Sequence, residues 1–228
     1  MDGFVLTAAH CLSFEETYLR LGDFLVVNPE PDCSSGVCKP RAERIIVERK
    51  IVHRYYNTQG KSRFDIGMFR MERTVEYSAY IRPICLLVDE QKSDVTQFKI
   101  SGWGLNERGE YGQTLLKADV YGVDSSYCEN NYGLQLDLSQ ICVGSTVSRT
   151  CPGDSGGPLS AELPYGEKSL HFQLGLNSYG SRVCINQGGF EVSTNVTYYM
   201  DWILDVIKVH EPQRATGDNW HSLVIIQH

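Results

Sequence analysis

The sequence predicts an all-β fold built from short antiparallel strands. Runs rich in β-branched and aromatic residues recur between turn residues, at 18–24, 44–52, 65–71, 97–102, 115–123 and 172–178. Glycine and proline separate these runs, as in Gly102-Trp103-Gly104. Strands do not alternate with long amphipathic helices, which disfavours a parallel α/β sheet.

One amphipathic helix is expected near the end of the chain, between residues 198 and 209. Apolar side chains recur there at spacings of three and four residues, which places on one helical face Tyr199, Trp202, Ile203, Val206 and Ile207. The opposite face carries Asp201, Asp205 and Lys208. We expect the apolar face to dock on the β core, and residues 210–228 to form a C-terminal tail.

Length and composition indicate a soluble globular domain. A chain of 228 residues is long enough for one large β domain. It is 42% hydrophobic and 21% charged, which argues against wholesale disorder. No stretch approaches the roughly 20 apolar residues of a membrane span. The net charge of −7 gives no electrostatic reason to expect nucleic acid or an anionic membrane as a partner.

The eight cysteines favour disulfide bonds over a metal site. Paired C-x-x-C motifs are absent and no histidine lies at zinc-finger spacing, so no metal or other cofactor is expected. Disulfides form in oxidising compartments, and we therefore expect a secreted, extracellular protein. The residues from Met1 onward lack the pattern of a signal peptide. The protein is either cytosolic or the sequence begins inside a longer one, and the cysteines favour the second.

The strongest chemical signal is the hexapeptide Gly153-Asp154-Ser155-Gly156-Gly157-Pro158. A serine hydroxyl is a weak nucleophile until a neighbouring base, normally a histidine oriented by a carboxylate, takes its proton. Backbone N–H groups at Gly153 and Ser155 are placed to stabilise the oxyanion of acyl transfer. Glycines after the serine permit positive φ angles and close approach of a substrate backbone. The loop has the parts that an acyl-transfer site requires.

Two further motifs supply a candidate base and carboxylate, Thr7-Ala8-Ala9-His10-Cys11 and Phe64-Asp65-Ile66-Gly67-Met68. With Ser155 they follow the order His, Asp, Ser and resemble the chymotrypsin–trypsin family of serine proteases. The resemblance implies two six-stranded antiparallel β-barrels, the first incomplete here, with a C-terminal α-helix. It places the catalytic domain at residues 1–209. His10 would be the general base, Asp65 would hold its tautomer and Ser155 would attack the substrate carbonyl.

Other segments extend this resemblance. Ser178-Tyr179-Gly180 is similar to the segment that hydrogen-bonds an extended substrate, with Tyr179 where tryptophan is usual. Residues 82–86 and the loop containing Cys33 and Cys38 resemble arthropod clip-domain proteases of clotting, melanisation and developmental cascades. The resemblance implies a secreted, monomeric endopeptidase that acts on protein substrates in a cascade and has serpin-type inhibitors as possible partners.

The sequence departs from the family pattern at the substrate pocket. Arg149 occupies the place of the aspartate with which trypsin-like members bind a P1 lysine or arginine, and Glu191 stands where a glycine of the pocket wall is usual. An Arg149–Glu191 pair would close the pocket floor. We therefore expect specificity other than tryptic. Two alternatives stay open: Arg149 points into solvent, or Glu191 selects basic residues.

The resemblance implies that the sequence begins inside the family's catalytic domain, so that the front of that domain is expected to be missing here. In the family a cleaved N-terminal amine pairs with the acidic residue before the nucleophile, here Asp154. Without that amine and the opening strands, we expect the chain alone to be poorly stable and inactive. The resemblance also implies disulfides that pair Cys33 with Cys38, Cys128 with Cys142, and Cys151 with Cys184.

Two cysteines are left without partners by this pairing. The resemblance implies that Cys11 bonds an upstream cysteine and that Cys85 tethers the pro-region left after activation, although a direct bond between the two is arithmetically possible. Asn195-Val196-Thr197 is an N-glycosylation sequon.

Two other classes of protein compete with this interpretation. The glycines around Ser155 also satisfy the G-x-S-x-G elbow of α/β-hydrolases, whose histidine follows the serine. Candidates for that histidine are His171, His210, His221 and His228. Only the protease would lose its base on mutation of His10. A non-catalytic protease homologue that acts by binding is the second alternative, and labelling with a fluorophosphonate would distinguish it.

Overall fold

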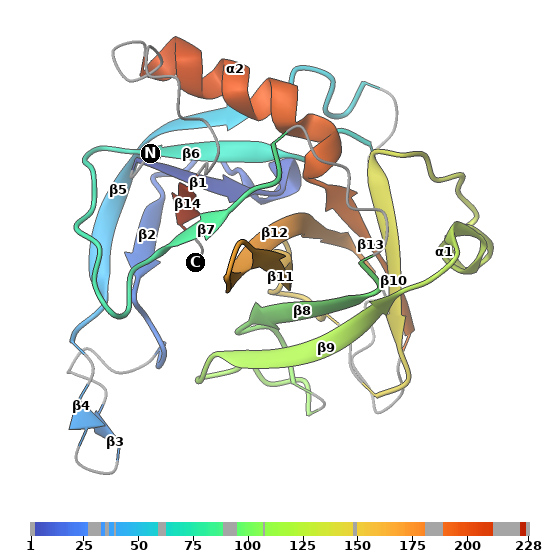
Figure 1. Ribbon diagram of the computed structural model, residues 1–228, viewed down its shortest axis with the longest axis horizontal. Helices are drawn as coiled ribbons and strands as arrows, with labels where there is room; N and C mark the ends of the chain where they lie inside the picture. Colours follow the sequence, from blue (N-terminus) through green and yellow to red (C-terminus); the bar gives the residue numbers. More distant parts are fainter. Residues whose placement is uncertain are drawn as a thin grey trace.

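The computed structural model describes residues 3–26, 33–34, 37–38, 40–58, 63–88, 95–106, 108–147, 150–180, 189–211 and 224–226. Its strands form a four-stranded sheet, an eight-stranded sheet that closes on itself, and a hairpin of β3 (Cys33–Ser34) with β4 (Val37–Cys38) (Figure 1). The prediction of an all-β protein with one complete barrel, one incomplete barrel and a C-terminal helix is confirmed.

The complete barrel comprises six strands in the order β11-β8-β9-β10-β13-β12, and a pairing of β11 with β12 closes it. Its strands are β8 (Gln97–Gly102), β9 (Leu116–Gly122), β10 (Gln140–Ser145), β11 (Pro158–Tyr165), β12 (Lys168–Tyr179) and β13 (Gly189–Asn195). Alternate residues of each strand point inward, and their apolar side chains fill the barrel with a core that includes Phe98, Val120, Val143, Leu159 and Leu174.

The incomplete barrel is the sheet β1-β6-β5-β2, formed by β1 (Phe4–Thr7), β6 (Gly67–Met71), β5 (Glu43–Val52) and β2 (Tyr18–Leu21). All four residues of β1 are buried, because side chains cover both of its faces. One face packs against a core formed by Leu19, Leu21, Ile45, Phe69 and Met71. The expected strands at 18–24, 44–52 and 65–71 therefore belong to one sheet.

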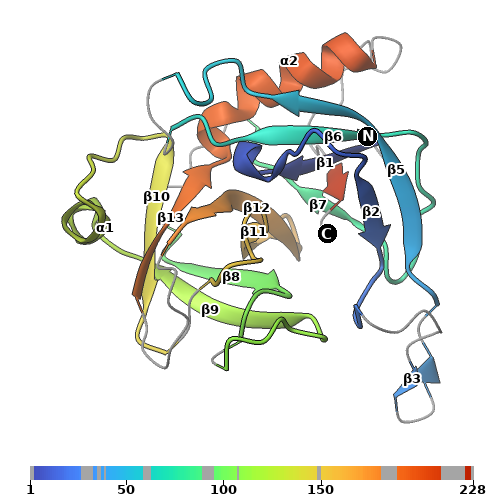
Figure 2. The ribbon, with the colours of Figure 1, turned by 180° about the vertical axis from the view of Figure 1, so that it is seen from behind.

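The C-terminal helix α2 (Met200–His210) lies along β6 in both views of the chain (Figures 1 and 2). A 3-10 turn, Thr197–Tyr199, leads into it. Ile203 and Ile207 are buried against Met68 and Leu86, as the apolar face predicted. Met200 is also buried, although the spacing of the apolar face did not include it.

A second helix, α1 (Ser125–Tyr132), was not expected from the sequence. Only Cys128 of its residues is buried, so it has no apolar stripe for periodicity to detect. Its ends are set locally. The Asp124 side chain accepts a hydrogen bond from the N–H of Ser126, and Gly133 ends the helix with a φ of 66°.

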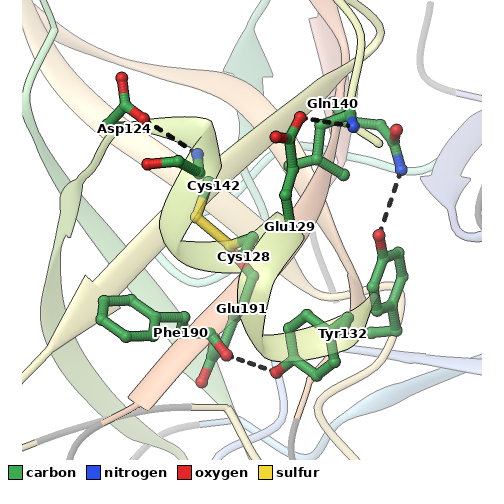
Figure 3. The surroundings of a disulfide bond; sticks show 11 residues. Asp124, Cys128, Glu129, Tyr132, Gln140, Cys142, Phe190 and Glu191 are labelled. Carbon is green, nitrogen blue, oxygen red and sulfur yellow. Dashed lines mark hydrogen bonds between the residues drawn. A yellow bond between two sulfur atoms is a disulfide. The ribbon is translucent and has the colours of Figure 1, made fainter. Parts of the chain in front are cut away.

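Disulfide bonds are seen at two of the expected places. Cys128 and Cys142 are bonded and join α1 to β10 (Figure 3). Cys151 is disulfide-bonded, while its expected partner Cys184 lies outside the described residues. The backbones of Cys33 and Cys38 pair across the β3–β4 hairpin. Cys11 and Cys85 are free, so no bond joins them directly.

The segment after α2 contributes a strand, β14 (Val224–Ile226), which pairs with β7 (Pro83–Cys85). Figures 1 and 2 both place β14 between β7 and β1. Part of the expected tail 210–228 thus extends the larger sheet. Among the described strands, Phe172 opposite Cys85 is the only parallel pairing, so the parallel sheet of an α/β-hydrolase is not formed there. No helix among the described residues is long and apolar enough to cross a membrane.

The docking of α2 can be tested at Ile203, whose side chain is fully buried. Ile203→Ala is expected to lower the free energy of unfolding by about 2–5 kcal/mol, because it leaves a cavity under the helix. Lys208→Ala on the exposed face is the matched control and should change it by less than about 0.5 kcal/mol. Urea unfolding measures both, and equal losses would contradict the docking.

Candidate active site

His10 and Asp65 meet at the edge of the four-stranded sheet. His10 lies in a short 3-10 helix, Ala9–Cys11, directly after β1, and Asp65 lies just before β6. Its carboxylate accepts two hydrogen bonds from His10, one from the backbone N–H (2.9 Å to Oδ1) and one at Nδ1 (2.7 Å to Oδ2). Asp65 is only 2% exposed. The two contacts fix the position and the plane of the imidazole together.

The turn that aims Asp65 is strained and is held by its neighbours. Phe64 has a φ of 56°, which is unfavourable for a bulky side chain. His53 stacks on its ring, with centroids 5.0 Å apart and planes 11° from parallel. On the other side, Thr194 Oγ1 donates to the carbonyl oxygen of Asp65 (2.9 Å). Packing and hydrogen bonding thus compensate for the backbone conformation beside the carboxylate.

Ser178 reaches Asp65 from the barrel. Its Oγ donates to Asp65 Oδ2 at 2.5 Å. A β-bulge makes this possible, because Asn177 pairs with Ser193 while Tyr179 pairs with Val192, which leaves Ser178 as the extra residue of β12. The sequence associated Ser178 with substrate binding only. Its contact with Asp65 depends on the register of strands, for which the local sequence carries no signal.

The contact with Asp65 strongly favours the charged form of His10. The hydrogen bond to Asp65, followed by one to Cys11, raises the pKa of His10 from 6.5 to about 10, and burial opposes this increase. The folded state therefore binds the proton more tightly than the unfolded state. The resulting stabilisation is fully present below pH 6.5 and is lost as the pH rises through about 10.

Ser155 faces the same cleft as His10. The cavity has a volume of about 290 Å³, and its lining includes His10, Ser155, Thr150, Ser178, Tyr179 and Gly180. A Cβ on Gly156 would lie 2.4 Å from Thr7 Oγ1, and Gly156 has a φ of 75°, so only glycine lets the serine loop pack this closely on the histidine loop. No hydrogen bond joins Ser155 to His10 among the described residues. Such contacts often tighten only when substrate binds.

The side chain of Asp154, the residue before Ser155, packs against Gly102 and Gly104. Its carboxylate accepts hydrogen bonds from the N–H groups of Gly104 (2.8 Å) and Cys151 (2.9 Å). A Cβ on Gly102 or Gly104 would lie within 2.5 Å of this carboxylate, which explains the two glycines around Trp103. Burial raises the pKa of Asp154, and the two backbone hydrogen bonds oppose that rise.

Glu191 is buried next to two residues that line the cleft, Thr150 and Gly180. It is 3% exposed, and its Oε1 accepts a hydrogen bond from the N–H of Thr150. A Cβ on Gly180 would lie 3.2 Å from Glu191 Cγ. Figure 3 shows Glu191 close to the Cys128–Cys142 disulfide, and its carbonyl oxygen lies 3.3 Å from Cys128 Sγ. Arg149 lies outside the described residues.

The other expected site residues occupy the barrel. Tyr179 lines the cleft, and burial raises the pKa of its hydroxyl to about 12. Asn195 ends β13, where its Nδ2 donates to the carbonyl oxygen of Leu138 (2.8 Å). Among the described residues, no group of three or more His, Cys, Asp or Glu side chains could hold a metal ion.

The effect of Asp65 on His10 can be measured by NMR. Asp65→Asn preserves the shape of the side chain but removes its charge, so the pKa of His10 is expected to fall from about 10 towards 6.5. Asp201→Asn on the exposed face of α2 is the control and should leave this pKa unchanged. A His10 pKa near 6.5 in the parent protein and in both variants would contradict the coupling.

Comparison with known proteins identifies relatives of this chain. It matches the trypsin family over residues 1–203. The Spaetzle-processing enzyme of Drosophila melanogaster is 34% identical over 221 residues, which cover 88% of this chain and 55% of that protein. Serine protease grass, also of Drosophila melanogaster, is 33% identical over 220 residues, which cover 90% of this chain and 58% of that protein.

A solved structure resembles the fold just described. The crystal structure of the Drosophila Grass clip serine protease of the Toll pathway superposes with a TM-score of 0.82 at 31% identity, covering 92% of this chain and 63% of that one. The chain therefore spans less than two thirds of the length of these relatives. Since the family match extends over most of the chain, and the fold agrees with it, the chain belongs to the trypsin family.

Proposed function

We propose that this chain is the catalytic domain of a secreted serine endopeptidase that hydrolyses peptide bonds through an acyl-enzyme on Ser155. The observation that carries the proposal is the double hydrogen bond between Asp65 and His10, in a cleft that Ser155 also lines. A buried carboxylate, an oriented imidazole and an exposed hydroxyl are the three groups that acyl transfer by serine requires.

Each group has one task in the reaction. His10 in its neutral form, which becomes more populated as the pH rises towards its pKa of about 10, takes the proton of Ser155 as the oxygen attacks the substrate carbonyl. It then passes this proton to the leaving amine. Asp65 holds the tautomer with the proton on Nδ1 and stabilises the imidazolium that forms. Water then attacks the acyl-enzyme with the same assistance. The N–H groups of Gly153 and Ser155 stabilise the oxyanion in both steps.

Asp154 is the proposed partner of the amine that appears on activation. Its carboxylate is half-buried and is held by two backbone N–H groups, while burial raises its pKa. A cation brought to this carboxylate would offset the cost of burying its charge. Asp154 directly precedes Ser155 in the chain, so the position of its side chain affects the orientation of the oxyanion donors.

The proposed substrate is another secreted protein in an extracellular cascade. The names of two relatives, Spaetzle-processing enzyme and Grass clip serine protease of the Toll pathway, support processing of a protein within a pathway. Serpin-type inhibitors are proposed partners, because they present an extended loop to the same cleft. The chain would act as a monomer, with Cys85, free and half-buried, tethering the upstream pro-region.

The specificity proposed is not that of trypsin. Glu191 contacts Thr150 and lies close to Gly180, and both of these residues line the cleft, so we propose that Glu191 limits the depth of the cleft where a P1 side chain would enter. Such a pocket favours small P1 side chains over long ones. The proposal rests on the position of Glu191.

Covalent labelling tests the proposed chemistry. The intact protein, cleaved to its active form, is expected to react with a fluorophosphonate at Ser155, and Ser155→Ala should abolish the label. His10→Ala should slow labelling by about 10³-fold or more, because the serine loses its base. Mass spectrometry locates the label. An activated protein that remains unlabelled would instead be a non-catalytic homologue that acts by binding.

Peptide cleavage tests the pocket. Glu191→Gly is expected to raise kcat/KM for P1 leucine or methionine relative to P1 alanine by about tenfold or more, since it opens the space below Gly180. Glu191→Gln fills the same volume without charge and should keep the parent preference. Rapid cleavage after arginine or lysine by the parent protein and by Glu191→Gln would contradict the proposal. If only the parent cleaved there, Glu191 would be the selector of basic residues.

A further inference from the structure

We propose that Asn177 is a positioning residue for the oxyanion hole, because its side-chain amide orients the peptide unit that joins Asp154 to Ser155. The inference rests on the proposed function, in which the N–H of Ser155 is one of the two oxyanion donors. Asn177 lies in β12 and is 4% exposed. It carries neither the nucleophile nor the base.

Asn177 is tied to the serine loop by three hydrogen bonds. Its backbone N–H donates to the carbonyl oxygen of Gly157 (2.9 Å), and its own carbonyl oxygen accepts from the N–H of Gly156 (2.8 Å). Both contacts involve the backbone, so they do not depend on which side chain stands at position 177. The third is specific to the side chain: Nδ2 donates to the carbonyl oxygen of Asp154 (3.2 Å).

That third contact acts on the oxyanion donor through the geometry of the peptide bond. The bond between Asp154 and Ser155 is trans, so its carbonyl oxygen and the N–H of Ser155 lie in one plane and point in opposite directions. Holding the oxygen therefore sets the direction of the N–H. Gly157 donates a second hydrogen bond to the same oxygen (3.0 Å), and the two donors together define the tilt of the plane.

The bulge in β12 links this contact to the rest of the site. Successive side chains of a regular strand point to opposite faces, and both faces of this part of β12 are buried, since residues 172–178 are all buried. Because the bulge falls between Asn177 and Tyr179, Asn177 reaches the serine loop while Ser178 reaches Asp65. Asn177 therefore positions the loop of the nucleophile, and Ser178 positions the carboxylate that orients the base. Both residues belong to β12.

The side chain of Asn177 has a cost in folding stability, which indicates a role beyond folding. Asn177 Oδ1 is buried and has no hydrogen-bond partner among the described residues. An unpaired buried acceptor destabilises the folded state. Valine at this position would remove it, and Asp154 would keep its hydrogen bond from Gly157. Stability alone therefore favours an apolar residue at position 177, whereas orientation of the Ser155 peptide favours the amide.

The test compares Asn177→Val with a matched control in the intact, activated protein. We expect Asn177→Val to lower kcat by about 10- to 100-fold with KM within about twofold, since loss of a whole oxyanion donor costs about 10²–10³. Its unfolding temperature should stay the same or rise. Gln173→Leu replaces another buried amide of β12, one that does not contact the serine loop, and should leave kcat unchanged.

A second variant and an inhibitor separate orientation from general disruption. Asn177→Asp keeps the shape but not the donor and should lower kcat at least as much as Asn177→Val. A peptidyl trifluoromethyl ketone, which forms an oxyanion on Ser155, should lose affinity in parallel with kcat, while the affinity for a cleaved peptide product stays constant.

The outcomes distinguish failure of this inference from failure of the proposed function. If the parent protein reacts with the fluorophosphonate and Asn177→Val retains the parent kcat, the positioning role is wrong. Equal losses of kcat in Asn177→Val and Gln173→Leu, or a loss that follows a lower unfolding temperature, would also overturn it. If the activated parent protein does not react with the fluorophosphonate, the proposed function itself fails.

Discussion

The buried carboxylate of Asp65 is the interaction on which the rest of the site depends. Two donors from His10 and one from Ser178 satisfy its oxygens, while Thr194 holds its backbone carbonyl. His10 follows a strand of the four-stranded sheet, whereas Ser178 and Thr194 belong to the barrel. A buried charge is tolerated only when hydrogen bonds compensate for lost water. The same contacts therefore join the two halves and assemble the geometry of the proposed catalytic site.

Two other acidic side chains, like Asp65, accept hydrogen bonds that hold nearby segments of the chain in place. Asp154 accepts from the backbone N–H groups of Gly104 and Cys151, and Glu191 accepts from the N–H of Thr150, which lines the cleft. Each acidic side chain fixes a segment of backbone through these hydrogen bonds. The side chain of Asn177 donates to the backbone carbonyl oxygen of Asp154. Orientation of the reacting groups thus comes from polar contacts, while the apolar cores on either side supply rigidity.

The glycines around the site are explained by what surrounds them. Gly102 and Gly104 leave room for the carboxylate of Asp154, and Gly156 leaves room for Thr7 while adopting a positive φ. The sequence marked these positions as turns or as parts of a motif. The structure shows close approach of polar groups from separate elements, so a side chain at any of the three would displace a functional contact.

The sequence by itself predicted six of the described strands, the C-terminal helix and the proposed reacting groups. His10, Asp65 and Ser155 stand in local motifs whose chemistry can be recognised without partners, and the apolar spacing around Ile203 predicted the C-terminal helix. Only the tertiary structure revealed α1, which has no apolar face and is held instead by an N-terminal cap and a disulfide. It also decided that Ser178 points to Asp65 and Asn177 to the serine loop. The physical reason is that a bulge and its register arise from pairing with distant strands, which no short stretch of sequence records.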